Sequence, residues 1–143
     1  MRERWEQMFI VFVLLLCVSS CAGAELIVIQ IVNGKTNKPT SKAKIYVSFA
    51  PGSGRQSIQL LTNDNGEASF DSGDLGLFQV HPIALVACGE QPVGSQPRNY
   101  SVDEIMKTGI RTENDCGHSG REPIRGHLLY FVRQAGWWEL FKN

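Results

Sequence analysis

Four cysteines are the residues of this 143-residue chain with the clearest chemistry. Cys17 and Cys21 lie in an apolar N-terminal stretch, whereas Cys88 and Cys116 lie far down the chain. An even pair of cysteines in an oxidising compartment predicts a disulfide. A bond between Cys88 and Cys116 would close a loop of about 29 residues, which the chain-entropy model values at about 3.5 kcal/mol.

Histidines offer a second chemistry, which is metal binding. The chain has three histidines, His81, His118 and His127. Cys88, Cys116 and His118, together with either His81 or His127, would supply two cysteine and two histidine ligands. None of these residues shows the C-x₂₋₄-C or H-x₃₋₅-H spacing that makes a zinc site specific. We therefore expect no metal and no other cofactor. A small periplasmic metal-dependent hydrolase that uses the three histidines is the alternative function.

Acidic residues at turns offer a third chemistry, which is calcium binding. Asp64, Asp71 and Asp74 would bind Ca²⁺ through carboxylate oxygens, but they do not form an EF-hand loop and acidic residues are common in turns. The sequence also has no G-x-S-x-G nucleophile elbow. We therefore expect no catalytic residue and a protein that is not an enzyme.

The charge balance excludes one class of partner. The chain has 14 basic and 14 acidic residues, so its formal net charge is zero. Nucleic-acid binding depends on a surplus of Lys and Arg that neutralises phosphates, and we expect no nucleic-acid partner. With 43% hydrophobic residues, the composition is that of a globular protein rather than a disordered chain. The length suits a single domain.

The first 24 residues have the pattern of an export signal. Met8–Val18 is an uncharged run of eleven residues, which fits the hydrophobic region of a signal peptide and is too short to span a bilayer. Arg2 and Arg4 precede it, although Glu3 and Glu6 offset their charge. Small residues follow it. We therefore expect an exported protein with a single domain over residues 25–143.

Two cleavage sites compete at the end of this signal. Val18-Ser19-Ser20-Cys21 resembles the bacterial lipobox, in which the cysteine becomes lipid-modified and anchors the protein to a membrane. Ala22-Gly23-Ala24 is an A-x-A site for ordinary signal peptidase, which would release a soluble periplasmic or secreted protein. An uncleaved anchor is the third alternative. We favour the lipid anchor on Cys21, facing the periplasm or the cell exterior.

The C-terminal tail is the most unusual feature of the mature chain. It contains Trp137, Trp138, Leu140 and Phe141, and Trp137 and Phe141 would share a face if the stretch is helical. Aromatic anchors are enriched at interfaces, so Trp137, Trp138 and Phe141 are candidate contacts for an envelope protein or a glycan. The alternative is that the tail folds back and caps an open end of the domain.

Between these ends, the chain predicts a series of short strands. Alternating or β-branched runs separated by turn residues indicate strands over residues 26–32, 43–49, 57–62, 67–70, 77–80, 83–87 and 127–133. The first run is β-branched on both faces, which is typical of a central strand covered on both sides. Seven strands with regular turn signals predict an antiparallel β-sandwich.

Two local signals refine this prediction. Asn63-Asp64-Asn65-Gly66 favours the positive φ of a tight turn and predicts a hairpin between the strands at 57–62 and 67–70. Ser101-Val102-Asp103-Glu104 is a capping box, so we expect a short helix over residues 102–108 that ends at Gly109. This helix lies inside the proposed disulfide loop and would decorate one end of the sandwich.

Residues 28–70 resemble the carboxypeptidase regulatory-like, transthyretin-like sandwich domains. The likeness is carried by Asn33-Gly34, Lys38-Pro39, Ala43–Val47 and Thr62–Phe70. The family pattern is a strand, a turn with Gly-x-Pro, a strand, and then Thr-Asp-x-x-Gly-x-Phe-x-Phe. This chain departs from the pattern at Asn63 and Ala68.

The resemblance implies a seven-stranded, prealbumin-type sandwich that serves as an accessory or adhesion module of exported proteins, usually without catalysis. It transfers no active site. The related hydroxyisourate hydrolases end in Tyr-Arg-Gly-Ser, whereas this chain ends in Glu139–Asn143. We therefore expect a non-enzymatic cell-envelope protein with a binding or structural role.

Overall fold

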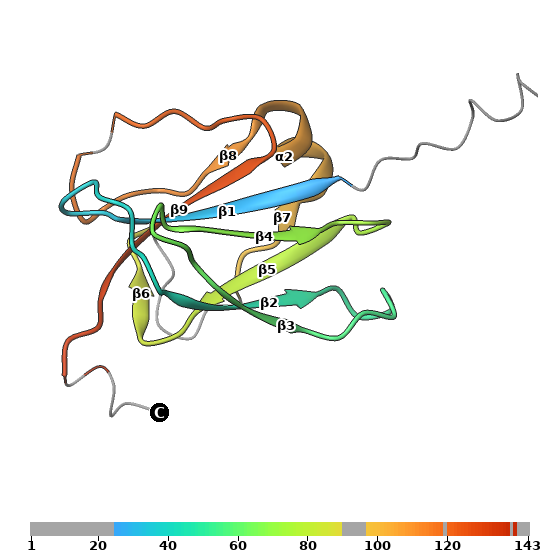
Figure 1. Ribbon diagram of the computed structural model, residues 1–143, viewed down its shortest axis with the longest axis horizontal. Coiled ribbons are helices and arrows are strands. Elements are labelled where there is room, and N and C mark those ends of the chain that lie inside the picture. Colours follow the sequence, from blue (N-terminus) through green and yellow to red (C-terminus); the bar gives the residue numbers. More distant parts are fainter. Residues whose placement is uncertain (1–24, 90–96, 119, 138, 140–143) are drawn as a thin grey trace, which may run out of the picture.

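Two β-sheets pack face to face in the computed structural model, which describes residues 25–89, 97–118, 120–137 and 139 (Figure 1). The first sheet has the strand order β4-β1-β9-β6, with β8 also paired to β9, and the second has the order β3-β2-β5-β7. The strands are β1 (Leu26–Asn33), β2 (Lys44–Phe49), β3 (Ile58–Leu61), β4 (Glu67–Asp71), β5 (Leu77–Pro82), β6 (Leu85–Ala87), β7 (Tyr100–Ser101), β8 (Ile110–Arg111) and β9 (His127–Gln134). The mostly β, two-layered architecture is as the sequence predicts.

All seven predicted strands are present, as β1 to β6 and β9. The described chain contains two more, β7 and β8, so the strand count is higher than predicted. Each of these is only two residues long and flanks the helix α2 (Val102–Thr108). Such short strands carry no visible alternation, and only their pairing with β5 and β9 defines them.

The prediction of an antiparallel sandwich holds for the second sheet but only in part for the first. Strands β1 and β9 pair in parallel over six residue pairs, from Val28–His127 to Asn33–Val132, and β8 also runs parallel to β9. A parallel pair requires a long crossover connection, and here most of the domain lies between the two strands in sequence. The pairing means that β1 and β9 finish at the same end of the molecule.

The prediction of a hairpin at Asn63–Gly66 is also wrong. A tight turn forms there, because the side-chain Oδ1 of Asn63 accepts hydrogen bonds from the N–H groups of Asn65 and Glu67. However, β3 pairs with β2, whereas β4 pairs with β1 in the other sheet. Before the turn, Thr62 Oγ1 accepts from the N–H of Ala43 at 2.8 Å. The turn therefore carries the chain from one sheet to the other.

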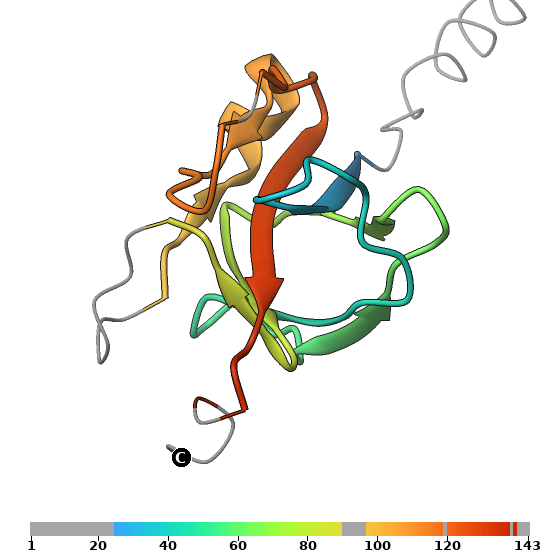
Figure 2. The same cartoon turned by 90° about the vertical axis from the view of Figure 1, so that its left-hand side faces the viewer.

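The predicted helix is confirmed as α2, with the predicted bounds. Ser101 is its N-cap and accepts from the N–H of Glu104 at 3.4 Å, and Gly109 closes it with φ 75°. Val102 and Ile105 are the residues that it buries. In Figures 1 and 2, α2 lies at the opposite end of β9 from the C-terminal segment. The helix is therefore a cover over one end of the sandwich.

The main core lies between the sheets and is built around aromatic rings. Phe70 of β4 contacts Phe78 of β5 at a centroid distance of 5.1 Å, Phe78 contacts Tyr100 of β7 at 6.0 Å, and Tyr100 contacts Tyr130 of β9 at 6.1 Å. Since these residues belong to both sheets, the rings join the two layers. Isoleucines of β1 and β2 pack in the same core, together with aliphatic residues of the other strands and of α2.

A second, smaller core covers the outer face of the first sheet. It contains Val32, Leu129 and Phe131, together with Cys88 and the partly buried Cys116. As a result β9 is buried on both faces from residue 128 to residue 132. The strand at residues 26–32 was predicted to be covered on both faces. This holds for β1 only at its C-terminal end, because the side chains nearer its start that point away from the main core are partly or fully exposed.

The buried tyrosines make the stability of the protein sensitive to alkaline pH. Burial raises the pKa of both Tyr100 and Tyr130 above the ordinary value of about 10. The unfolded chain then releases these protons first, so the stabilisation is complete below pH 10 and is lost as the pH rises beyond it. Denaturation between about pH 8 and pH 11 checks this, and Tyr100→Phe should show a shallower loss than the unmodified protein. A parallel loss in both proteins would contradict it.

Candidate functional site

The candidate site lies at the end of the sandwich where β1 and β9 both finish, and we call this the distal end. Asn33 is the last residue of β1 and pairs with Val132, next to Arg133 and Gln134 of β9. The β1 strand begins at Leu26, seven residues earlier, which corresponds to about 23 Å along the strand. The distal end is therefore far from the point where the N-terminal segment enters the fold.

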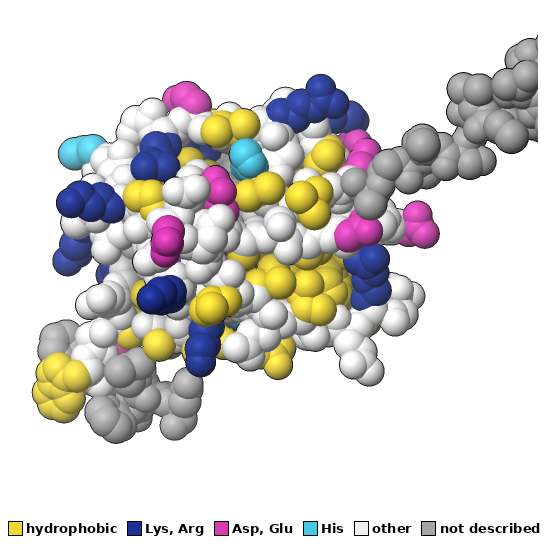
Figure 3. Space-filling model, viewed as in Figure 1, with side chains coloured by type: hydrophobic (Ala, Val, Ile, Leu, Met, Phe, Trp, Pro, Cys, Tyr) yellow, Lys and Arg dark blue, Asp and Glu magenta, His cyan; other side chains and the backbone are white. Residues whose placement is uncertain are grey.

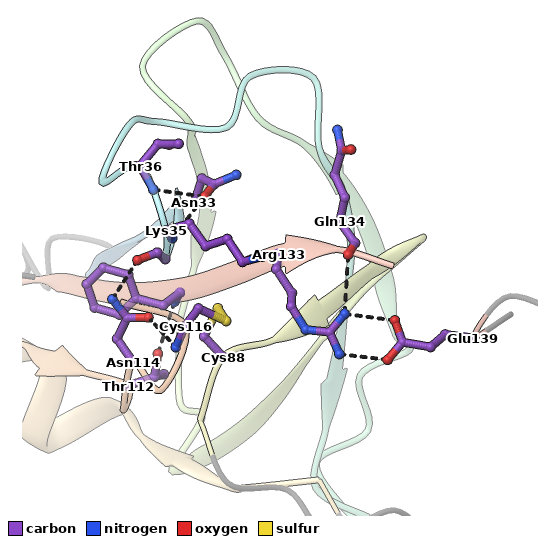
Figure 4. Close-up of a disulfide and its surroundings, with 12 residues drawn as sticks. Asn33, Lys35, Thr36, Cys88, Thr112, Asn114, Cys116, Arg133, Gln134 and Glu139 are labelled. Carbon is purple, nitrogen blue, oxygen red and sulfur yellow. Dashed lines mark hydrogen bonds and ion pairs between the residues drawn. A yellow bond between two sulfur atoms is a disulfide. The ribbon is translucent and has the colours of Figure 1, made fainter. Parts of the chain in front are cut away.

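The predicted disulfide between Cys88 and Cys116 is confirmed, and it lies at the distal end (Figure 4). Cys88 follows β6, and its N–H donates to the carbonyl of Phe131 in β9. Cys116 belongs to the segment that returns along the outer face of the same sheet. Within that segment, Thr112 Oγ1 accepts from the N–H of Phe131 at 3.0 Å. The disulfide thus holds this outer covering against β9.

Gly34 is the backbone position that admits the disulfide. Its N–H donates to the carbonyl of Val132, and its own carbonyl accepts from the side-chain amide of Asn114 at 3.0 Å. A Cβ atom at this position would meet the side-chain oxygen of Asn114 and would lie 2.6 Å from the sulfur of Cys88. The close approach of β1 to the disulfide therefore requires glycine. The Asn33-Gly34 pair, which the sequence shows as a turn signal, has this additional packing role.

The tail returns to β9 through an ion pair. Arg133 donates to both carboxylate oxygens of Glu139, at 2.7 Å and 2.6 Å, in the side-by-side geometry drawn in Figure 4. The N–H of Gly136 also donates to this carboxylate at 2.7 Å, and the N–H of Glu139 donates to the carbonyl of Gly136. These hydrogen bonds raise the pKa of Arg133 above its ordinary value, so the guanidinium stays charged.

The aromatic residues predicted to contact a partner are only partly visible. Trp137 is 72% exposed, whereas Trp138 and Phe141 lie outside the described residues. Glu139 was not predicted from the sequence, because a single acidic residue that follows two tryptophans forms no recognisable motif. The sequence did place Glu139 six residues after Arg133, which lies near the end of a predicted strand, and this spacing could have indicated an ion pair.

A cavity of about 560 Å³ opens at the distal end beside the tail. Its lining residues are Asn33, Lys35, Arg133, Gln134, Gly136 and Glu139. The side-chain Oδ1 of Asn33 accepts from the N–H groups of Lys35 and Thr36, which fixes the turn that carries Lys35. The cavity is therefore bordered by two cationic side chains and one carboxylate.

The three histidines do not come together. His81 lies on β5 in one sheet and His127 on β9 in the other, while His118 lies in the loop after Cys116. His81 Nε2 lies 2.9 Å from the hydroxyl oxygen of Ser48, but within the described chain no hydrogen bond orients the other ring nitrogen. In the part of the chain that the structure describes, the three histidines therefore form no metal-binding group.

The aspartates of the proposed calcium site act as turn formers. Asp71 Oδ1 accepts from the N–H of Gly73 at 2.8 Å, and Asp64 lies in the turn that joins the two sheets. Among the residues that the structure describes, no group of three or more His, Cys, Asp or Glu side chains is placed to hold a metal ion. Beside Asp71 lies a cationic side chain, because the guanidinium of Arg55 donates to the carbonyl of Asp71 at 2.7 Å.

The export signal, Cys21 and the A-x-A site at Ala22–Ala24 lie outside the described residues. The helix that the structure describes is too short to cross a membrane. The Cys88–Cys116 disulfide is typical of proteins that fold in an oxidising, exported environment.

Comparisons with known proteins identify no family. No family model matches the chain, and no curated protein matches it. A solved structure, the 9R-lipoxygenase from Cyanothece PCC8801, overlaps with a TM-score of 0.31 and 18% sequence identity, over 75% of this chain and 16% of the lipoxygenase chain. This overlap is too weak to carry an argument about fold or function.

Proposed function

We propose that this protein is a non-enzymatic lipoprotein of the bacterial cell envelope, anchored through Cys21, whose β-sandwich presents a binding surface away from the membrane. The observation that carries the proposed orientation of the sandwich is the parallel pairing of β1 and β9. It sends the C-terminal tail to the opposite end of the molecule from the N-terminal attachment point. The resemblance of residues 28–70 to carboxypeptidase regulatory-like, transthyretin-like modules supports a binding role rather than catalysis.

A lipid on Cys21 would hold the sandwich close to the bilayer. Only three residues lie between Cys21 and Glu25, whose carbonyl accepts hydrogen bonds from both the N–H and the hydroxyl of Ser72. The four residue steps from Cys21 to Glu25 span at most about 14 Å. The end that would face the membrane carries the exposed side chains of Leu26 and Leu77, and Figure 3 shows a hydrophobic patch near the point where the N-terminal segment leaves.

The tail supports the proposed orientation. Trp137 is exposed beside the distal cavity, and Arg133 fixes the turn that carries it. Tryptophan and arginine are the side chains most often found at the centres of protein interfaces. With the N-terminus at the bilayer, these residues would be the part of the domain that reaches outward to an envelope protein or a glycan.

Replacement of Cys21 with alanine tests the anchor. The unmodified protein should sediment with membranes, and Cys21→Ala should appear in the soluble exported fraction, because the acyl chains that supply the membrane affinity are then absent. Cys17→Ala is the matched control, since Cys17 leaves with the signal and this variant should stay with the membrane. Fractionation of cells and immunoblotting give the readout. A soluble unmodified protein, or a membrane-bound Cys21→Ala variant, would contradict the proposal.

A further inference from the structure

The distal cavity has the charges of an anion site. Lys35 and Arg133 line it, and Glu139 is the only acidic side chain among its described lining residues. Glu139 is bound to Arg133 through both carboxylate oxygens, so Lys35 contributes an excess positive charge at the mouth. Asn33 and Gln134 add side-chain amides, which donate hydrogen bonds. A net positive, polar cavity of this size favours a small anionic ligand.

The bond between Arg133 and Glu139 indicates which anion fits. A carboxylate already lies against the guanidinium in bidentate geometry, with both distances below 2.8 Å. The two side chains are 32% and 30% exposed. Because both side chains are partly open to solvent, the carboxylate of another molecule can reach the guanidinium of Arg133 and compete with that of Glu139.

We propose that the distal cavity binds a carboxylate-bearing ligand, with Arg133 exchanging the carboxylate of Glu139 for that of the ligand and Lys35 supplying a second cationic contact. Glu139 is then an internal competitor that occupies the site when no ligand is present. This inference deepens the proposed binding role and rests on it, but the chemistry of the site does not depend on the lipid anchor. The ligand is recognised at the end of the domain that faces away from the membrane.

Three substitutions distinguish a site that binds a ligand from an ion pair that only holds the tail in place. Arg133→Gln and Lys35→Gln should each weaken carboxylate binding about tenfold or more, because charged hydrogen bonds are lost. Glu139→Gln should instead strengthen binding about two- to fivefold, since the competitor is removed. If the pair only holds the tail in place, Glu139→Gln weakens binding or leaves it unchanged.

The test is a titration of the mature protein, purified as the cell exports it, at low ionic strength. Glutarate is the probe, and glutaramide, a neutral diamide of similar size, is its control. The expected result is saturable binding of glutarate but not glutaramide, seen as a shift of the Arg133 side-chain Nε–H signal in nuclear magnetic resonance spectra. Added salt should weaken the binding.

Four results would overturn this proposal. They are the absence of saturable glutarate binding, equal binding by Arg133→Gln, weakened or unchanged binding by Glu139→Gln, and equal or tighter binding of inorganic phosphate, which would indicate an anion site without carboxylate recognition. None of them bears on the anchor, because the fractionation of Cys21→Ala is independent of the cavity. A failure of the ligand proposal is thus distinguishable from a failure of the proposed function.

Discussion

Replacing Phe78 with alanine is expected to lower the free energy of unfolding by about 3–5 kcal/mol. Phe78 has no exposed surface, and its ring lies against Phe70 of the opposite sheet and Tyr100 of its own. The substitution removes the central ring of the aromatic contacts that join the layers and leaves a cavity between them. Typical domains have only about 5–15 kcal/mol of stability. Equilibrium denaturation in guanidinium chloride, followed by circular dichroism, measures the loss.

Leu61→Ala is the matched control for this prediction. Leu61 is also a large apolar residue on a strand of the second sheet, but it is 58% exposed. Its replacement should change the free energy of unfolding by no more than about 0.5 kcal/mol. Equal losses in the two variants would show that Phe78 does not lie between the sheets.

The double substitution Cys88→Ala and Cys116→Ala removes the disulfide. It is expected to lower the free energy of unfolding by about 3.5 kcal/mol. The bond closes the long loop between β6 and the outer covering of β9, and Cys88 is itself buried. Without it, the unfolded chain gains loop entropy and the outer covering is held only by hydrogen bonds and packing. Denaturation of the oxidised protein and the double variant, both without reductant, measures the difference.

Gly34 provides the control for the disulfide. A side chain at this position meets both the side-chain oxygen of Asn114 and the sulfur of Cys88, so Gly34→Ala should destabilise the oxidised protein. Part of that cost should disappear in the double cysteine variant, because residues in contact are energetically coupled. An identical cost of Gly34→Ala in both backgrounds would show that β1 does not pack against the disulfide.

The sequence predicted the elements of the fold well because their signals are local. The capping serine and the terminating glycine gave the helix at 102–108 its bounds, and alternation of apolar residues gave the strands their positions. Strand partners are not local. Nothing within the runs at 26–32 and 127–133 states that they pair in parallel. The turn at Asn63–Gly66 fixes four residues but does not determine which sheet the next strand joins.

The candidate site was predicted only in part for the same reason. Cysteine counting identified the Cys88–Cys116 bond without knowledge of the fold. The cavity at the distal end depends on β1 and β9 ending side by side, which brings Lys35 next to Arg133 although they are far apart in sequence. The role of Glu139 depends on the turn at Gly136. Such contacts follow from topology rather than from a motif.

The intact mass of the natively expressed protein decides whether the domain is anchored through Cys21. We expect a mature chain that begins at a diacylglyceryl-modified Cys21 and is two hydrogens lighter than its reduced form, as a bond between Cys88 and Cys116 requires. A lipid on Cys21 fixes the membrane-facing end of the sandwich and leaves the tail at the other. An unmodified chain that begins at Glu25 would contradict the anchor and with it the proposed orientation.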